Sequence, residues 1–433
     1  MKRANSNPAQ NATLPDIPLP KAPDPNLDPA GYLRSIYAVR ERSRYVLDKA
    51  KRNQLRHFTV DMSKFADTAN HVVMIIKRDF DPDYSSIPPW TVAALRVDNM
   101  ERTRRLMDLF LVSVLLDAGA GTKWQYKSKE SGKMYRRSEG LAVASLEMFK
   151  TGLFSSNPDL PCSVDAGGLR RLTTEKMPKG LQVTADNPLD GLEGRTQLLI
   201  RLSDALLDQR IFGQESRSGN MLDHLLSHPS TEVAAVPIVP LPTLWLTLMN
   251  GLSPIWPATR TQIDGIPLGD AWHCSSMPSH PTHPWENIVP FHKLTQWLTY
   301  SLMVPMQKLA NVHFVGTELL TGLPEYRNGG LLVDTGLLTL KPKAAKRGPE
   351  QYEMNAMRQD DDVIVEWRAV TVGFLDMLLE EVNLLLGLRG DKKLSLAQML
   401  EAGTWKGGRE IAEVSRPNTK ELRIVILSDG TVF

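Results

Sequence analysis

The spacing of hydrophobic residues along the chain predicts a mainly helical protein. Apolar side chains recur at intervals of three and four, which places them on one face of an α-helix. This pattern predicts helices over residues 29–47, 62–77, 99–116, 138–151, 194–208, 220–226, 291–310 and 365–388. The pair Asp28-Pro29 favours the first of these starts, because Asp can cap a helix and Pro fits its first turn.

The middle of the chain, residues 236–290, breaks this pattern. Prolines crowd this stretch (VPIVPLP, SPIWPATR, SMPSHPTHPW) together with four tryptophans. Prolines at this density disfavour regular helices, whereas so much aromatic surface is seldom left in water. We therefore predict a long, irregular but packed segment, the kind of segment that often forms the wall of a ligand site.

Two stretches predict small β additions. The Gly-Gly turn and β-type residues of PEYRNGGLLVDTGLLTL predict a hairpin or strand over 324–340, and RIVILSDGTVF predicts a strand pair joined at Asp429-Gly430. A loop is expected over 79–89, which holds a double proline. No linker divides residues 29–433, so we expect one large helical domain with small β-hairpin additions. A disordered or extended N-terminal arm, residues 1–28, precedes it.

Composition narrows the class of protein. The chain has 433 residues, of which 42% are hydrophobic and 23% charged, as is ordinary for a globular protein. Its net charge of +2 gives no reason to expect a nucleic-acid partner. The apolar run at 106–116 is shorter than the roughly 20 residues of a membrane span, so no membrane partner is expected. The only cysteines, Cys162 and Cys274, exclude a disulfide framework and favour a reducing, cytoplasmic location.

No standard catalytic or metal-binding signature occurs. The chain lacks a P-loop, a GxGxxG turn after a strand, HExxH and GxSxG. His224 and His228 stand four residues apart but have no third ligand at zinc spacing, and His273, His280 and His283 lie among prolines. We therefore expect no metal and no cofactor.

Polar residues concentrate instead in four segments, of which the first is DAGAGTKWQY. Asp117 emerges at the end of a buried apolar helix into a Gly-rich turn, with Lys123 close behind. An acid at that end of a helix opposes the helix dipole and needs a compensating cation. Lys123 or a ligand would serve, and a purely structural Asp117–Lys123 pair is the alternative.

The second segment sets Trp256, Arg260, Asp270 and Trp272 among prolines. Aromatic rings beside a cation and an acid suit a flat polar ligand such as a pyrimidine or ureide. They equally suit a packed loop.

In the third segment, IVPFHKLTQW, His292 and Lys293 occupy the first turn of a predicted helix. Helix N-termini favour anions, so these residues suit a phosphate. A surface lysine and a capping histidine are the alternative.

The fourth segment, LPEYRNGGLLVDTG, is the richest. Glu325, Arg327 and Asp334 occur within ten residues, and Asp334 follows an apolar run that would leave it partly dry, with a tunable pKa. Downstream, VEWR places Glu366 and Arg368 at the start of a helix. Some of these acid–arginine pairs must be structural salt bridges.

These segments resemble the uracil catabolism protein 4 family of fungi and bacteria, long described as a domain of unknown function. The resemblance covers nearly everything after the arm and is carried by long stretches, among them DLFLVSVLLDAGAGTKWQYKSKESGKMYRRSEGLAVASLEMFKTGLFSS, GLEGR, IWPATR, LGDAW, IVPFHKLTQWLTYSLMVPMQ, ELLTGLPEYRNGGLLVDTGLLTL and GTWKGGREIAEVSRPNTKEL. The family pattern has a longer segment after the IPP at 87–89, which this chain lacks.

The resemblance implies a place in a uracil-degrading pathway that works on ribonucleotides. A cyclohydrolase-like protein opens the ring, and the step left for this family is hydrolysis of the N-glycosidic bond of a ribosylurea phosphate to ribose 5-phosphate and urea. The PEYR segment also resembles the Asp-Tyr-Arg segment of queuosine-salvage glycosylases. The alternatives are a C–N hydrolase acting on the opened ureide and a non-catalytic protein that channels an intermediate in contact with the cyclohydrolase-like enzyme.

For N-ribosyl hydrolysis, a carboxylate below the sugar would stabilise its positive charge or activate water. Asp334 is the first candidate for this role, Glu325 the second and Asp117 the third.

The ligand of such a site would be a phosphorylated ribosyl compound. Its phosphate would be held by Arg327, Lys293 and Arg260, and its leaving group would lie against Trp256, Trp272 and Tyr326. The further candidates for substrate binding are His292, Lys123, Asp270, Glu366 and Arg368.

Overall fold

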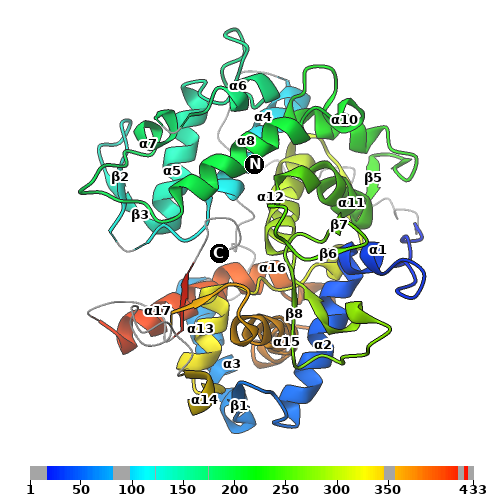
Figure 1. The fold of residues 1–433 in the computed structure, drawn as a ribbon, viewed down its shortest axis with the longest axis vertical. Helices are drawn as coiled ribbons and strands as arrows, with labels where there is room; N and C mark the ends of the chain where they lie inside the picture. Colours follow the sequence, from blue (N-terminus) through cyan, green and yellow to red (C-terminus); the bar gives the residue numbers. More distant parts are fainter. Residues whose placement is uncertain are drawn as a thin grey trace, which may run out of the picture.

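The computed structural model describes residues 17–80, 98–121, 123–173, 175–345, 356–417 and 424–427. Helices make up most of these residues and strands are short, which confirms the prediction of a mainly α fold. Figure 1 shows the helices gathered in two groups, one above the other. In the described part of the chain no helix combines the length and the apolar character that a membrane span requires.

The first group surrounds one hydrophobic core, in which Trp124, Phe212 and Trp245 are completely buried. Its central contact is between α4 and α12, which pack along each other. The helices of this group are α4 (Asn99–Leu116), α5 (Arg137–Lys150), α6 (Ala166–Arg170), α7 (Lys176–Gly180), α8 (Leu192–Ala205), α9 (Gln209–Phe212), α10 (Met221–Leu226), α11 (Leu241–Gly251) and α12 (Lys293–Leu309).

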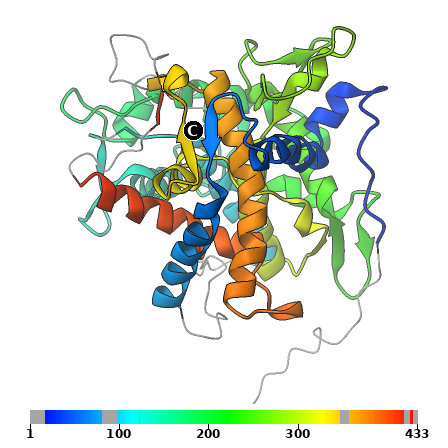
Figure 2. The ribbon, with the colours of Figure 1, turned by 90° about the horizontal axis from the view of Figure 1, so that it is seen from below.

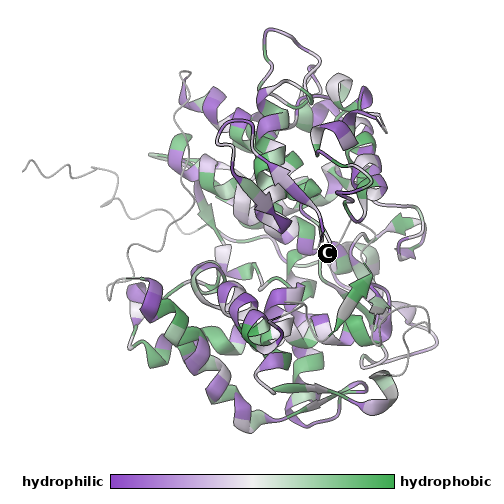
Figure 3. Cartoon of the chain, turned by 90° about the vertical axis from the view of Figure 1, so that its left-hand side faces the viewer, coloured by the Kyte–Doolittle hydropathy of each residue, from purple (hydrophilic) through white to green (hydrophobic). Residues whose placement is uncertain are grey.

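The second group is built around one long helix, α15 (Asp362–Leu385), which crosses the middle of the view in Figure 2. A second hydrophobic core lies around it and includes Phe58, Trp367 and Phe374. The other helices of this group are α3 (Phe65–Asp79), α13 (Tyr326–Asp334), α14 (Pro342–Ala345), α16 (Leu396–Met399) and α17 (Trp405–Ser415), with a π-helical turn at Leu400–Thr404. In both groups hydrophobic residues gather on the inner faces of the helices (Figure 3).

Helix α2 (Ile36–Lys51) joins the two cores. Ile36 and Val39 at its start belong to the first core, whereas Val46 and Leu47 belong to the second. The single helix predicted over 29–47 is broken before α2, because Ser35 is extended and caps α2 through the amide of Ala38. The preceding helix, α1 (Pro29–Arg34), begins after Asp28, whose side chain accepts the amide of Gly31 as expected of a cap.

The strands form small pairs, as predicted, and some of the pairs join distant parts of the chain. The antiparallel pairs are β1 (Phe58–Val60) with β11 (Leu338–Leu340), β2 (Gln125–Lys127) with β3 (Met134–Arg136), β6 (Gln262–Ile263) with β7 (Ile266–Pro267), and β8 (Ala271–His273) with β9 (Ile288–Pro290). In a three-stranded sheet, β5 (Pro237–Pro240) pairs with β4 (Glu232–Val233) and, in parallel, with β10 (His313–Val315).

The segment around the Gly-Gly pair is a helix, α13, so the hairpin predicted there was wrong, and only Leu338–Leu340 is a strand. Glu325 starts the helix by accepting the amides of Arg327 (2.9 Å) and Asn328 (2.6 Å). A Cβ atom on Gly329 would lie 2.6 Å from the ring of Trp367. The glycine therefore serves the close packing of α13 on α15 and not a turn.

The middle segment also contains a helix that its prolines concealed, so the prediction of an irregular course holds only for the rest of it. Helix α11 spans Leu241–Gly251, with Pro242 in its first turn, where the missing N–H costs nothing. The segment is packed: Trp245 is fully buried and Trp272 is 8% exposed.

Some predicted features fall on residues outside the described ranges. These are residues 1–16 of the arm, nearly all of the 79–89 loop and the Asp429-Gly430 turn. At the C-terminal end, β13 (Val425–Leu427) pairs in parallel with β12 (Ala356–Arg358). Residues 17–28 of the arm lie against the protein, since the Tyr37 hydroxyl donates to the carbonyl of Pro20.

A buried ion pair ties the two groups together. Arg368 on α15 donates two hydrogen bonds of 2.7 Å to Asp270, and each side chain is only 1% exposed. The Asp270 carboxylate also accepts the Trp272 indole (2.7 Å) and the backbone amide of Lys293 at the start of α12 (3.0 Å). Burial alone would raise the pKa of Asp270, but the charge and hydrogen bonds of Arg368 hold it well below its usual value.

We expect Asp270→Asn to lower the free energy of unfolding by about 3–5 kcal/mol, because it leaves the Arg368 guanidinium buried without a counter-charge. The loss should be largest near neutral pH. Since the pKa of Asp270 is depressed in the folded protein, its contribution is present above the unfolded pKa and disappears as the pH falls through the acidic range. Urea unfolding followed at several pH values measures both effects.

The matched control is Glu380→Gln, which removes an acid from the exposed pair with Lys393 (2.9 Å). That change should cost less than about 1 kcal/mol. Equal losses in the two variants would contradict the importance given to the buried pair.

Candidate functional site

Polar side chains from four helix ends meet between the two groups of helices. They come from the end of α4, the start of α5, the start of α12 and the start of α13. We call this set the Asp117 cluster, and its members are Asp117, Ser138, Lys293, Glu325, Tyr326 and Arg327.

Asp117 is the residue at which α4 ends, and its side chain is half-buried. Burial raises the pKa of this carboxyl, while the charges of Lys293, Arg327 and Arg195 and the side chain of Ser138 act in the opposite direction. The net shift is upward. Asp117 is thus a partly dehydrated acid whose negative charge is opposed by burial and favoured by the cations around it.

Arg327 is a buried arginine whose hydrogen-bond donors are not all satisfied by the described residues. Its side chain is buried, and its guanidinium carbon lies 3.9 Å from the centre of the Trp405 ring and 5.5 Å from that of Tyr326. Among the residues that the structure describes, neither terminal nitrogen has a hydrogen-bond partner. Because a buried charged group without partners is costly, such an arginine is typical of a site that binds an anionic ligand.

Lys293 adds a second buried cation. It is the first residue of α12, and its ammonium lies 5.2 Å from the centre of the Trp297 ring. Burial lowers the pKa of Lys293, and the charges of Asp117 and Glu325 oppose this effect. The cluster therefore combines two buried cations with a dehydrated acid.

Glu325 and Tyr326 complete the cluster beside Arg327. Burial raises the pKa of Glu325, against the charge of Arg327 and the two backbone amides that Glu325 caps. The pKa of Tyr326 is also raised, chiefly by burial, and its hydroxyl shares the Ser138 side chain with Asp117. Glu325 is occupied by capping α13, which leaves Asp117 as the more available carboxylate.

Helix α17 and the π-helical turn before it also contribute residues that act on the cluster. Arg409 forms an ion pair with Glu139 on α5, and its guanidinium lies 4.9 Å from the Trp405 ring centre. Glu401, exposed on the π-helical turn, has a raised pKa because of lost solvation, opposed by Arg327. These contacts link the first group of helices to the second at the edge of the site.

Asp334, the first candidate for catalysis, lies at the opposite end of α13 from Glu325, about 13 Å away along the helix. Both of its oxygens accept hydrogen bonds from Arg416, at 2.7 and 2.6 Å, and its side chain is 1% exposed. Its carboxylate is therefore engaged in an ion pair outside the cluster.

Several predicted binding residues are held in internal contacts. Asp270, Trp272 and Arg368 form the buried network described above. Glu366 accepts the backbone amides of Arg56 (2.8 Å) and His57 (2.7 Å).

His292 precedes α12 in a left-handed conformation (φ 46°), and its ring nitrogen Nε2 bonds to the carbonyl of Leu33 (2.8 Å). Burial lowers its pKa to about 4, so the ring is neutral near pH 7 and cannot hold a phosphate by charge.

The remaining candidates lie apart from the cluster. Lys123 is exposed, and the cations that act on Asp117 are others, so the structural Asp117–Lys123 pair does not form. Arg260 is buried over the rings of Trp272 (4.8 Å) and Trp256 (5.8 Å) and also lies near Asp360. These aromatic residues do come together with a cation, as the segment predicted, but not beside Asp117.

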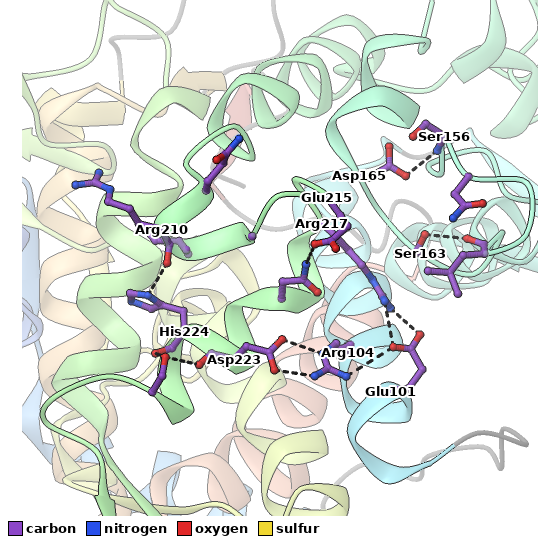
Figure 4. A pocket seen from close by; sticks show the side chains of 17 residues that line it. Glu101, Arg104, Ser156, Ser163, Asp165, Arg210, Glu215, Arg217, Asp223 and His224 are labelled. Carbon is purple, nitrogen blue, oxygen red and sulfur yellow. Dashed lines mark hydrogen bonds and ion pairs between the residues drawn. The ribbon is translucent and has the colours of Figure 1, made fainter.

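A separate surface hollow of about 890 Å³ lies between α4, α9 and α10 (Figure 4). Charged residues that line it form ion pairs with one another: Arg104 with Asp223 (2.7 Å) and Arg217 with Glu101 (3.0 Å). Unlike the Asp117 cluster, it holds none of the predicted site residues. Within the described ranges, no group of three His, Cys, Asp or Glu residues could hold a metal ion.

Three cluster contacts were missed by the sequence analysis: Ser138, Arg195 and Trp405. Ser138 and Trp405 each stand near a helix start, and Arg195 lies in GLEGR, a short stretch with no signature of its own. Only the fold brings them to Asp117 and Arg327, because each is separated from its partner by tens of residues.

Comparisons with known proteins cover almost the whole chain. A family profile described as "Protein of unknown function (DUF1688)" matches residues 32–433. Uracil catabolism protein 4 of Lachancea kluyveri is 42% identical over 442 residues, which cover 94% of this chain and 99% of that protein. Protein urg3 of Schizosaccharomyces pombe (strain 972) is 45% identical over 429 residues, 93% of this chain and 98% of that protein.

The terminal nitrogens of Arg327 have no hydrogen-bond partner among the described residues. We therefore expect inorganic phosphate to bind the protein at this arginine. At a hundred times its dissociation constant, phosphate should raise the free energy of unfolding by about 2.7 kcal/mol. Arg327→Met should abolish this effect, because it keeps most of the volume of the side chain but removes the nitrogens that would bind the phosphate oxygens. Thermal unfolding with and without phosphate is the measurement.

Arg170→Gln is the control, since Arg170 is a half-exposed arginine already paired with Asp204 (3.3 Å). It should leave the phosphate effect intact. Stabilisation of the Arg327→Met variant to the same extent as the parent protein would place phosphate elsewhere.

Proposed function

Because this chain belongs to the DUF1688 family, which includes uracil catabolism protein 4 of Lachancea kluyveri, we propose that it acts in uracil catabolism as an N-ribosyl hydrolase. Its substrate would be a ring-opened uracil ribonucleotide, a ribosylurea phosphate, and its products ribose 5-phosphate and urea. The observation that supports this reaction is the juxtaposition of the dehydrated Asp117 carboxylate with Arg327, whose terminal nitrogens have no hydrogen-bond partner among the described residues.

In this proposal the bond between ribose C1′ and the urea nitrogen breaks, and its electron pair leaves with the nitrogen. Positive charge develops on the sugar, and the Asp117 carboxylate stabilises it. Water adds to C1′ and gives a proton to Asp117, while the leaving nitrogen takes up a proton, so that one water is consumed. A carboxylate with a raised pKa is a better base for this step than an exposed aspartate.

The phosphate would be bound by Arg327. Its two terminal nitrogens, to which no described residue is hydrogen-bonded, match two phosphate oxygens, and its stacking on Trp405 fixes the plane of the guanidinium. The ammonium of Lys293 would add a second positive charge. Tyr326, half-buried beside Asp117, would form the wall against the leaving group.

The catalytic role is assigned to Asp117 and not to Asp334 for a physical reason. Arg416 already occupies both oxygens of Asp334, so that carboxylate would have to break two charged hydrogen bonds before it met a sugar.

We expect Asp117→Asn to lower kcat for release of ribose 5-phosphate from ribosylurea phosphate by about 10²–10⁴-fold, as for loss of a general base. The amide keeps the size of the side chain but neither stabilises the cationic sugar nor accepts a proton from water. Quantifying ribose 5-phosphate, urea and ammonia in the same reaction identifies the bond that is cleaved.

Asp334→Asn is the matched control, because it also removes one carboxylate. The Asp334→Asn variant should be less stable, because its ion pair with Arg416 is lost, but it should retain kcat. Full activity of Asp117→Asn would remove Asp117 from the mechanism. Release of ammonia with the ribosyl bond intact would identify a ureide hydrolase, and binding without turnover would identify a channelling protein; either result would overturn the proposed reaction.

A further inference from the structure

Arg195, on α8, is completely buried beneath the end of α4. Its Nε donates to the carbonyl of Leu116 (2.9 Å), one Nη donates to that of Gly119 (2.6 Å), and the other donates to that of Asp190. Two of these carbonyls stand immediately before and two residues after Asp117. The guanidinium therefore holds the backbone on both sides of the proposed catalytic acid.

The position of Asp117 explains why such a clamp is needed. The last carbonyls of a helix have no partner within the helix and carry the negative end of its dipole. An acid at that end is disfavoured unless a cation lies close by. Arg195 meets both requirements, because it bonds to the final carbonyl of α4, that of Leu116, and brings a positive charge to the same place.

Within the described ranges, Arg195 forms no ion pair with a neighbouring acid. Its three hydrogen bonds all go to backbone carbonyls. Burial lowers the pKa of Arg195 to about 10, and the charges of Asp117 and Asp190 act against this. The cation thus acts on Asp117 through space while its hydrogen bonds fix the backbone.

We propose that Arg195 is the positioning residue of the site: it fixes the backbone on both sides of Asp117, so that the carboxylate faces the substrate, and it places a positive charge beside that carboxylate. This inference rests on the proposed function only in taking Asp117 as the reacting carboxylate. It assigns a role to a residue that would itself touch neither the sugar nor the phosphate.

Other groups also face Asp117 and set the size of the expected effect. They are Lys293 from α12, Arg327 and Tyr326 from α13, and the uncharged Ser138 from α5. Since Lys293 and Arg327 remain when Arg195 is replaced, the pKa of Asp117 should rise further without the carboxyl becoming permanently protonated. The acidic limb of the pH profile of kcat/KM must then move to higher pH.

Two substitutions separate charge from geometry. Arg195→Gln removes the charge and should move the acidic limb of kcat/KM upward by about one pH unit. Arg195→Lys keeps the charge but cannot bond to three carbonyls. It should leave the limb in place and lower kcat by about 10–100-fold with little change in KM, as expected for a misplaced reacting group.

A second measurement does not depend on turnover. The pKa of Asp117 can be followed by carbon-13 NMR of aspartate carboxyls, with the Asp117→Asn variant identifying its signal. Arg201→Gln is the matched control, because Arg201 lies on the same helix and donates to a carbonyl remote from Asp117, that of Ile255 (2.7 Å). It should lower stability without moving the pKa of Asp117.

The outcomes distinguish this inference from the proposed function. If Arg195→Gln lowers stability but leaves the pKa of Asp117 and the pH profile unchanged, Arg195 is only structural and the inference fails. If Arg195→Gln does not fold, an Arg195→Lys variant with unchanged kcat overturns it equally. If the parent protein releases no ribose 5-phosphate while the pKa of Asp117 still shifts in Arg195→Gln, the reaction is wrong and the electrostatic role of Arg195 stands.

Discussion

The buried ion pair between Asp270 and Arg368 fixes the distance between the two halves of the site. Each Asp270 oxygen accepts one guanidinium bond and one further donor, the Trp272 indole or the backbone amide of Lys293, and the Nε of Arg368 also donates to the carbonyl of Pro324 (3.2 Å). A pair so deeply buried tolerates its lost hydration only with such complete hydrogen bonding. One interaction thereby anchors the start of α12, which carries Lys293, and the segment that leads into α13, which carries Arg327.

Three of the four charged residues of the Asp117 cluster stand where their own helices disfavour them; Glu325, which caps the start of α13, is the exception. Asp117 lies at the C-terminal end of α4, while Lys293 and Arg327 lie in the first turns of α12 and α13. The helix dipole stabilises the opposite arrangement, with acids at the start and bases at the end. Local stability therefore does not account for these charges, whereas a ligand with an anionic group and a developing positive charge would. Strain of this kind is common at functional sites.

Much of the fold could be predicted from hydrophobic spacing, because in long helices such as α4 and α15 apolar residues recur over several turns at intervals of three and four. The sequence also drew attention to Asp117, Lys293, Glu325 and Arg327, which the fold brings together. It could not show which acids were engaged elsewhere. Asp334 is paired with Arg416, 82 residues away in the sequence, and Asp270 with Arg368, 98 residues away. A local sequence pattern cannot predict pairs so far apart. The Gly-Gly pair led to the wrong prediction of a hairpin for a similar reason. The need for a glycine in α13 comes from the ring of Trp367, which is distant in the sequence.

Because α2 contributes to both cores, the order in which the chain is synthesised affects when each core can form. Among the residues that the structure describes, the second core takes buried residues from positions 46–76 and then no fully buried one before Trp272, while most of the first core comes from the intervening stretch. The apolar faces of α2 and α3 therefore leave the ribosome hundreds of residues before α13 and α15 arrive to cover them. The first core can form while the second is incomplete, so the nascent chain passes through a stage in which Val72, Val73 and Ile76 lack the side chains of α15 that cover them in the finished protein.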